Sequence, residues 1–292
     1  MKSLMTILKV FAGLGVIAVL ALVVFALKQV SEEFGQPQLT DQNEVANVLE
    51  QNQISDFEPG QREFNRAMEL IALGELAEAR EKLLYIQNLF PNSLNGPEAR
   101  RILGEMNMDE LLSVNNMENK SVHVVKSGDS YLAIAKKYET TIDCLVFLNG
   151  LTEMKTLHPG DEFVVMPLNF TLQVDVPNER LRLFRKDDEK KENVFVKEYL
   201  VQSMDLPRMR GSKLQTEIYI KRGERHGMVY STTSAGYRGA QKVLMLKRPA
   251  LQIRPVPEAD GDDPGRGFFL KMEDLEELAL LLRLGNEVEI LL

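Results

Sequence analysis

The chain has 292 residues and a formal net charge of −8, from 35 basic and 43 acidic side chains. An acidic balance argues against general nucleic-acid binding and favours solubility, and the length allows two or three small domains behind a terminal segment. The single cysteine excludes an internal disulfide bond, so packed cores must provide the stability. One cysteine and three scattered histidines match no zinc-binding spacing, and no glycine-rich phosphate loop is present, so we expect no metal site and no cofactor.

The amino terminus predicts a membrane anchor. Residues 10–27 carry no charge, and the apolar stretch before Lys9 extends this run to a length that can span a bilayer. A cleavable signal peptide would have a shorter apolar region and a small-x-small site, which residues 25–28 do not offer, so we favour an uncleaved anchor over residues 1–27. Lys2 and Lys9 precede the run and Glu32 and Glu33 follow it, so the positive-inside rule predicts a single pass through the inner (cytoplasmic) membrane. The bulk of the chain would lie in the periplasm or otherwise outside the cytoplasm.

Residues 28–58 are rich in Gln, Asn, Glu and Ser and predict a polar linker. Residues 59–113 predict a short helical segment, in which two amphipathic helices meet at Gly74 and a third spans 97–106. The segment resembles one tetratricopeptide (TPR) unit in its small residues and final proline, which are Ala67, Gly74, Ala79 and Pro91. Because one repeat rarely stands alone, we expect it to pack on a neighbouring part of the chain or on a protein partner.

Residues 121–168 predict the element order strand, helix, helix, strand. Alternation over residues 123–126 predicts a short strand, and the turn 127–130 leads into a helix that begins at Tyr131. A second helix ends at Asn149 and Gly150, both of which tolerate a left-handed backbone, and residues 163–166 form the closing strand. The residues expected to face the core from the two helices are Leu132, Ile134, Ala135, Tyr138, Ile142, Leu145 and Leu148.

In spacing and residue types, this stretch resembles a LysM domain along its whole length. The resemblance implies a βααβ fold that binds N-acetylglucosamine-containing glycans, such as peptidoglycan or chitin, in a shallow groove between the first turn and the loop before the last strand. The glycan-binding residues implied in this way are Gly128, Asp129, Ser130, Tyr131, Met154, Lys155, Thr156 and Leu157. An alternative stays open for single residues: Gly128 and Asp129 could serve merely to build the turn, and Leu157 merely to fill the core, without contact to glycan.

Residues 169–292 predict a mostly β domain. Strand-like alternation at 171–176, 181–184 and 194–201 suggests an antiparallel meander, and further strands follow up to residue 253. Residues 272–284 form the convincing helix of this region, and 288–291 form a closing strand. The whole chain is therefore expected to be a multidomain α+β protein.

The two ends of this last domain resemble the L,D-transpeptidase (YkuD-like) catalytic fold. LQVDVPNERLRLF at 172–184 is similar to the opening strands of that family. Residues 268–292 are similar to its close, in which an Arg-Met pair, a helix and a Gly turn lead to the final strand. The family attacks an acyl donor with a Cys thiolate beside an activating His. By this resemblance, the nucleophile position falls on Phe268 or Phe269, and the upstream His-Gly site falls on residues 253–255, centred on Arg254. Phe cannot form an acyl-enzyme, so we expect an inactive domain with no catalytic residues.

No other residue set predicts catalysis. His226 is followed by Ser231 and Ser234, but there is no nucleophile elbow and no paired acid, so a solvated loop histidine is the simpler interpretation. Cys144 has no basic neighbour that would lower its pKa, and we expect it to be an inert, partly buried side chain.

These patterns together predict a membrane-anchored protein of the bacterial cell envelope that binds peptidoglycan and is not an enzyme. Two alternatives remain open from the sequence. One is an active L,D-transpeptidase or other cell-wall enzyme with an atypical nucleophile, and the other is a scaffold whose helical segment recruits a cell-wall enzyme.

Overall fold

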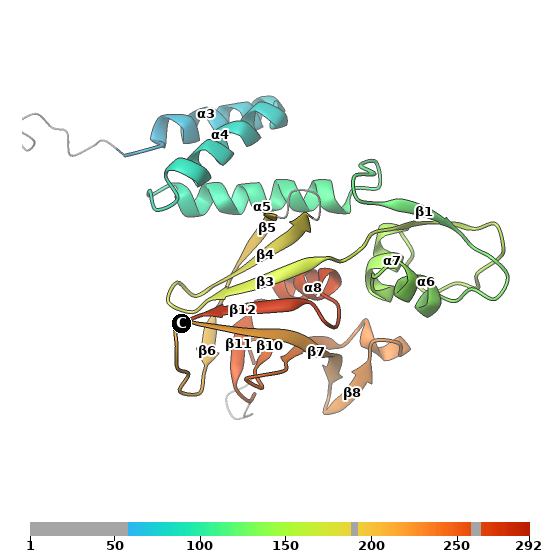
Figure 1. The fold of residues 1–292 in the computed structure, drawn as a ribbon. Helices are drawn as coiled ribbons and strands as arrows, with labels where there is room; N and C mark the ends of the chain where they lie inside the picture. Colours follow the sequence, from blue (N-terminus) through green and yellow to red (C-terminus); the bar gives the residue numbers. More distant parts are fainter. Residues whose placement is uncertain (1–57, 188–191, 258–263) are drawn as a thin grey trace, which may run out of the picture. The chain divides into compact units, whose positions relative to one another are not determined.

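The computed structural model describes residues 58–187, 192–257 and 264–292 (Figure 1). The predicted anchor over residues 1–27 and nearly all of the predicted linker over 28–58 lie outside these ranges, so both stay predictions. Within the described ranges, no helix combines the length and the apolar character needed to cross a membrane. Pro59–Leu292 form one compact unit.

The amino-terminal part of this unit is helical and consists of α3 (Gln61–Leu73), α4 (Leu76–Leu89) and α5 (Gly96–Leu112). Helix α3 ends at Gly74, whose φ of 80° suits a glycine and whose N–H donates to the Ile71 carbonyl at 3.0 Å. The prediction of two helices that meet at Gly74 is confirmed, and the third helix runs on to Leu112 instead of ending at Met106. The three helices share a small core of Ala67, Leu83, Ile86, Ala99 and Leu103.

Another side of α5 packs on strand β5 (Glu192–Leu200) (Figure 1). The Asn107 amide donates to the main-chain oxygens of Phe195 and Val196 at 3.2 and 2.9 Å, and Lys197 forms an ion pair with Glu105 at 3.0 Å. This contact confirms the expectation that the helical segment packs on a neighbouring part of the chain. A glycine permits the close approach, because a Cβ atom at Gly104 would lie 3.0 Å from the Lys197 side chain.

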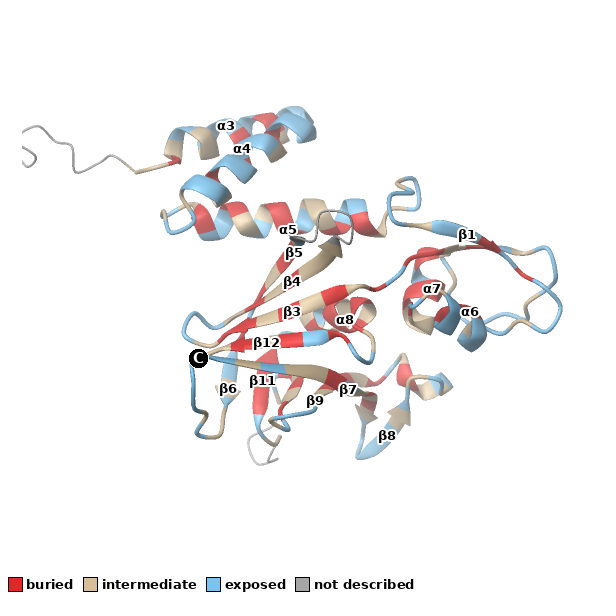
Figure 2. Cartoon of the chain, in the orientation of Figure 1, coloured by how far each residue is buried: buried red, intermediate tan, exposed pale blue. Residues whose placement is uncertain are grey.

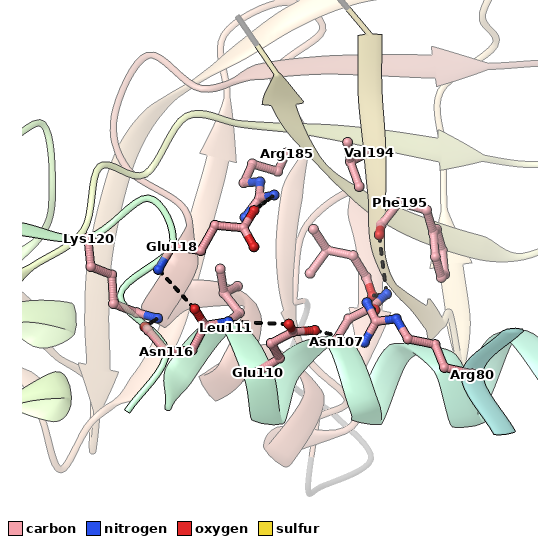
Figure 3. Close-up of a pocket in the computed structure, with 11 residues that line it drawn as sticks. Arg80, Asn107, Glu110, Leu111, Asn116, Glu118, Lys120, Arg185, Val194 and Phe195 are labelled. Carbon is pink, nitrogen blue, oxygen red and sulfur yellow. Dashed lines mark hydrogen bonds and ion pairs between the residues drawn. The ribbon is translucent and has the colours of Figure 1, made fainter. Parts of the chain in front are cut away.

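A pocket beside this contact is lined by the helices, the connection over residues 113–120 and the edge of the sheet (Figure 3). Its two arginines each meet a carboxylate: Arg80 lies 2.8 Å from Glu110, and Arg185 lies 3.1 Å from Glu118. The Asn116 amide also donates to Glu110 at 3.3 Å. These ion pairs and hydrogen bonds connect the helices, the 113–120 connection and the edge of the sheet. The polar side chains of this pocket therefore have a structural role.

The next part contains β1 (Ser121–Val124), α6 (Tyr131–Lys137), α7 (Ile142–Leu148) and β2 (Glu162–Val165), and β1 pairs antiparallel with β2. The predicted order of strand, helix, helix and strand is confirmed. Each helix has a side-chain cap, because Ser130 Oγ accepts the Ala133 N–H at 3.2 Å and Thr141 Oγ1 accepts the Cys144 N–H at 3.1 Å. One core prediction is wrong: Leu132 is 57% exposed, because Ile134 and Ala135 form the buried face of the short helix α6.

The βααβ part packs against the sheet that follows it. Cys144 and Leu148 of α7 belong to the large core of the sheet, and Cys144 is fully buried rather than partly buried as expected. Thr141 Oγ1 donates to the Leu280 carbonyl at 3.4 Å, and the Leu168 N–H donates to the Glu139 carbonyl at 3.0 Å. The two parts therefore form a continuous hydrophobic core.

The rest of the chain forms one long sheet and a helix. Its remaining elements are β3 (Phe170–Asp175), β4 (Arg180–Asp187), β6 (Ser203–Asp205), β7 (Lys213–Arg225), β8 (Met228–Ser231), the short 3₁₀ helix η2 (Ala235–Tyr237), β9 (Gln241–Leu246), β10 (Gln252–Pro255), β11 (Gly267–Leu270), α8 (Met272–Leu281) and β12 (Glu287–Leu291). The prediction of a mostly β domain with a carboxy-terminal helix and closing strand is confirmed.

The sheet order is β5-β4-β3-β12-β7-β9-β10-β11-β6, with β8 paired to β7. The antiparallel meander expected over the first three strands is confirmed for β3, β4 and β5. Strand β12 returns from the end of the chain to lie between β3 and β7, and it pairs parallel with β3, as β11 does with β10. These long-range pairings leave no local trace in the sequence, because periodicity reports which face of a strand is buried and not which strand lies beside it.

The main core lies between the sheet and α8, which buries Leu275, Leu278 and Ala279 against it (Figure 2). Lys221 of β7 is also inside this region, with its side chain 2% exposed. Its ammonium group donates to the carbonyls of Ala279 and Leu282 at the end of α8. A buried lysine at a helix carboxyl terminus is favourably placed, because the last carbonyls of a helix lack partners within the helix.

Candidate functional site

A groove of about 590 Å³ lies between the start of α6 and the loop that joins α7 to β2. Four of the eight residues predicted to bind glycan line it, namely Tyr131, Lys155, Thr156 and Leu157. The other four, Gly128, Asp129, Ser130 and Met154, lie in the predicted turn and loop but do not line the groove. The structure therefore brings half of the predicted set together.

The turn residues have structural partners of their own. Gly128 has a φ of 90°, which favours glycine, and Ser130 caps α6. Asp129 accepts the Lys126 N–H at 2.8 Å and lies 2.9 Å from Nε2 of His123. The bond from Lys126 and then that with His123 lower the pKa of the Asp129 carboxyl below its usual value. For Gly128 and Asp129, the alternative of a turn-building role therefore has direct geometric support.

His123 was not expected to have a role, yet it organises the base of this turn. Its side chain is 4% exposed, and its ring nitrogens meet Asp129 on one side and the Tyr138 hydroxyl, at 3.1 Å, on the other. A histidine with both nitrogens bonded inside the fold is held in one orientation. The sequence signal that could have indicated this is the position of His123 in a strand, where alternation turns it inward between Val122 and Val124.

Tyr131 forms one wall of the groove. Its ring meets Phe163 edge to face, with centroids 5.8 Å apart and an interplanar angle of 86°. The Tyr131 hydroxyl is buried and has no hydrogen-bond partner among the described residues. Tyr131 and Leu157 also pack against the small core of this part, so each combines a groove position with a packing role.

The opposite wall is the loop before β2. The Val125 N–H donates to the Asp161 carbonyl at 2.8 Å, and the Gly160 N–H donates back to the Val125 carbonyl at 2.9 Å. These bonds fix the end of the loop to the end of β1, while Lys155 and Thr156 stay exposed to solvent. Groove residues that the sequence reasoning missed are Asn149, Leu151, His158, Asp161, Glu162 and Phe163. Most of them follow the predicted loop directly, so a wider window around 154–157 would have included them.

The positions that the sequence resemblance assigned to the nucleophile and its activating base lie on neighbouring strands. Strand β10 pairs parallel with β11, which places Ile253 opposite Phe268 and Arg254 opposite Phe269. Phe268 and Phe269 are 0% and 4% exposed. The Arg254 guanidinium lies 3.3 Å from the Glu224 carboxylate and donates to the Pro264 carbonyl at 3.1 Å. The remaining sequence candidate, His226, is exposed in the turn between β7 and β8, with a φ of 50°.

A family model described as LysM domain matches residues 123–165. This part of the chain is a LysM domain. Domains of this kind bind peptidoglycan or chitin-like glycans, which relates the protein to the cell wall.

The solved structures that show weak similarity to the chain include the following three. The first is a fused Zn-dependent amidase/peptidase/peptidoglycan-binding domain-containing protein from Clostridium acetobutylicum, with 11% identity, a TM-score of 0.30 and coverage of 42% of this chain and 51% of that one. The others are L,D-transpeptidase 1 from Mycobacterium tuberculosis (6% identity, TM-score 0.28, coverage 43% and 60%) and an L,D-transpeptidase variant from Enterococcus faecium (15%, 0.28, 50% and 60%). The matches thus span about half to three fifths of those chains. No curated protein matches this chain in sequence.

Proposed function

We propose that this protein holds the N-acetylglucosamine-containing glycan of the cell wall through the groove of its LysM domain, while its amino-terminal segment anchors it in the inner membrane. The observation that carries the glycan proposal is the groove itself, in which Tyr131 faces the loop of Lys155, Thr156 and Leu157. Apolar and aromatic walls with a few polar groups are the usual composition of a site for a small ligand.

The chemistry of the groove suits an uncharged sugar chain. Tyr131, Leu151 and Leu157 offer partly exposed apolar surface for the faces of sugar rings, and Thr156 is an exposed polar neighbour. The groove also contains both signs of charge, with Lys155 against Asp161 and Glu162. A neutral, amphipathic ligand fits this balance better than a strongly charged polymer does.

Membrane anchoring would strengthen a weak glycan contact. Once one end of a chain is fixed, a second binding event becomes intramolecular, and its apparent affinity rises with the effective concentration. The support for the anchor is the uncharged run at residues 10–27 and the lysines before it.

For the carboxy-terminal domain we propose a binding or structural role without catalysis. The support is chemical: Phe268 and Phe269 stand where the resemblance to L,D-transpeptidases implies a Cys, and both are packed in the interior. A phenyl ring can neither attack an acyl donor nor be activated by a base.

Titration of the full-length protein with chitooligosaccharides in detergent tests the groove. Lys155→Ala and Thr156→Ala should each weaken binding by about threefold to tenfold, since a lost hydrogen bond is worth roughly 0.5–1.5 kcal/mol. Lys136→Ala is the matched control, because Lys136 is exposed on the same domain and does not line the groove. Deletion of residues 121–168 is a poor test, because it would uncover the core that Cys144 and Leu148 share with the sheet.

Equal affinities for the wild type, Lys155→Ala and Thr156→Ala would refute the assignment of the groove. An equal loss in Lys136→Ala would do the same, because it would show that the loss depends on the general charge of the domain. Circular dichroism of each variant checks that the fold is kept.

A further inference from the structure

A second hollow, of about 650 Å³, lies where the turn between α4 and α5 meets strands β3, β4 and β5. We call it the arginine pocket, because Arg100, Arg180 and Arg182 line it. It shares no lining residue with the LysM groove. No sequence motif assigns a binding role to any of the three arginines.

The strand pattern explains why arginines gather here. Leu181 and Leu183 of β4 are fully buried in the core, so the alternating side chains of Arg180 and Arg182 lie on the opposite face. The strand register places Arg182 opposite Glu198 of β5, and Arg180 opposite Asp175 of β3. Helix α5 adds Arg100 from above this face, with Nε of Arg100 3.4 Å from the Glu198 carboxylate.

The charges of the arginine pocket do not cancel. Three guanidinium groups share two buried carboxylates, since the side chains of Glu198 and Asp175 are 7% and 9% exposed. The Glu198 carboxylate forms ion pairs with Nε of Arg182 at 2.8 Å and with Nε of Arg180 at 3.6 Å. The Asp175 carboxylate forms an ion pair with Nη1 of Arg182 at 3.0 Å. One positive charge is left over within this set.

Donors are left over as well. Nη1 of Arg100 donates to the Pro91 carbonyl at 2.7 Å, and Nη1 of Arg180 donates to the carbonyls of Asn178 and Glu179. The Nη2 groups of the three arginines have no partner in the described part of the chain. The arginine pocket therefore contains several positively charged N–H donors that have no acceptor among the described residues.

We propose that the arginine pocket binds the free carboxylate of a short peptide. A guanidinium group presents paired N–H donors that match the two oxygens of a carboxylate. A phosphate monoester has the same kind of oxygens but carries about −1.5 to −2 charges, which exceeds the single surplus charge here. The class of ligand that fits the charge is thus a monoanionic carboxylate.

The other walls indicate what surrounds the carboxylate. Phe184 and Phe195 line the arginine pocket and meet edge to face, with ring centroids 6.1 Å apart, and Pro91 and Pro97 add apolar surface. Gln87 lines it too, and its Oε1 is buried without a hydrogen-bond partner among the described residues. A peptide with small apolar side chains meets these features, because its side chains suit the apolar walls and its N–H groups are donors for Gln87.

Calorimetric titration of the full-length protein in detergent tests this proposal with acetylated dialanine and with the same peptide as its carboxy-terminal amide. The acid should bind and the amide should bind at least about tenfold more weakly, because hydrogen bonds to a charged group are among the strong ones. Arg180→Gln and Arg100→Ala should each lower the affinity for the acid by about tenfold. Arg101→Ala is the matched control, because Arg101 adjoins Arg100 but is 58% exposed and pairs with Glu98 outside the arginine pocket.

The proposal would be overturned by equal binding of acid and amide, by no binding of the acid at millimolar concentration, or by an equal loss of affinity in Arg101→Ala. Displacement of the acid by a lower concentration of inorganic phosphate would also overturn it in favour of a phosphate ligand. Circular dichroism shows whether each variant is folded, and Arg180→Lys, which keeps the charge but loses the paired donors, should still weaken binding. The chitooligosaccharide affinity should not change in these variants, so the outcome is separate from that of the LysM groove.

Discussion

Lys221 gives the sharpest test of how the LysM domain is attached to the sheet. Its ammonium group lies 3.8 Å from the Asp143 carboxylate of α7 and donates to the carbonyls of Ala279 and Leu282. Burial lowers the pKa of Lys221 to about 8, and the charge of Asp143 opposes that fall. The contact between the two parts of the chain therefore contains a buried charge that is close to losing its proton.

The sign of the pH effect follows from proton binding. Between pH 8 and the ordinary pKa of 10.5, the unfolded chain holds the Lys221 proton and the folded chain does not. The free energy of unfolding contributed by this group therefore rises with pH across that window. At about 1.4 kcal/mol per pH unit, the full rise is about 3 kcal/mol.

Urea unfolding followed by circular dichroism measures this rise, since the chain has no tryptophan for fluorescence. Lys221→Met removes the titration, so the free energy of unfolding of the wild type minus that of the variant should rise by about 2–3 kcal/mol from pH 7.5 to 10. The difference also cancels most of the contribution of other groups near Lys221, which are Asp143, Cys144, Tyr237, Lys242 and Glu276. In Asp143→Asn the rise should begin at a lower pH. A difference that stays constant from pH 7.5 to 10 would refute the reasoning.

The remaining predictions concern two buried positions, the membrane topology and the carboxy-terminal domain. Burial raises the pKa of Cys144 to about 11, so its thiol should not react with iodoacetamide in the folded protein, and Cys144→Ser should cost about 1–3 kcal/mol of stability; rapid alkylation would contradict this. Gly267→Ala should destabilise the sheet by more than about 1 kcal/mol in thermal unfolding, because its Cβ would lie 2.0 Å from the Gln252 carbonyl oxygen; an unchanged melting temperature would contradict this. A reporter fused after Leu292 should be active as a periplasmic type, and cytoplasmic activity would exclude the predicted topology. The full-length protein should form no acyl adduct with a carbapenem in mass spectrometry, and an adduct in the carboxy-terminal domain would favour the enzyme alternative.

The LysM domain could be predicted because its signals are local. Ser130 and Thr141 cap the two helices, and Gly150, with a φ of 62°, follows the second helix in the left-handed conformation. Asn149, which also tolerates that conformation, does not adopt it, because its φ is −99°. Its side chain instead bonds across to β2, where it accepts the Val164 N–H at 2.8 Å and donates to the Val164 carbonyl at 2.9 Å.

The attachment of the LysM domain to the sheet was missed, although α7 contained a sign of it. Apart from Asp143, its sequence IDCLVFL is apolar on every side, and a helix that is apolar all round has more than one buried face. Leu145 faces the small LysM core, whereas Cys144 and Leu148 face the large core of the sheet. Asp143, the single charge of this helix, is the residue that meets Lys221. The position of the partner lysine, far along the chain, could not be predicted from α7 alone.

The attachment changes what the LysM groove can contribute. A LysM domain on a flexible tether would sample many orientations and would gain only from effective concentration. Here α7 packs into the core of the sheet, so the orientation of the groove relative to the carboxy-terminal domain is fixed by hydrophobic contacts and by the Lys221–Asp143 pair. A flexibly tethered domain loses orientational entropy when it binds. In this fold that entropy is already lost when the chain folds. A ligand that reaches both the LysM groove and the arginine pocket would therefore gain more from the second contact than it would with two freely moving domains, provided that its length matches the fixed separation.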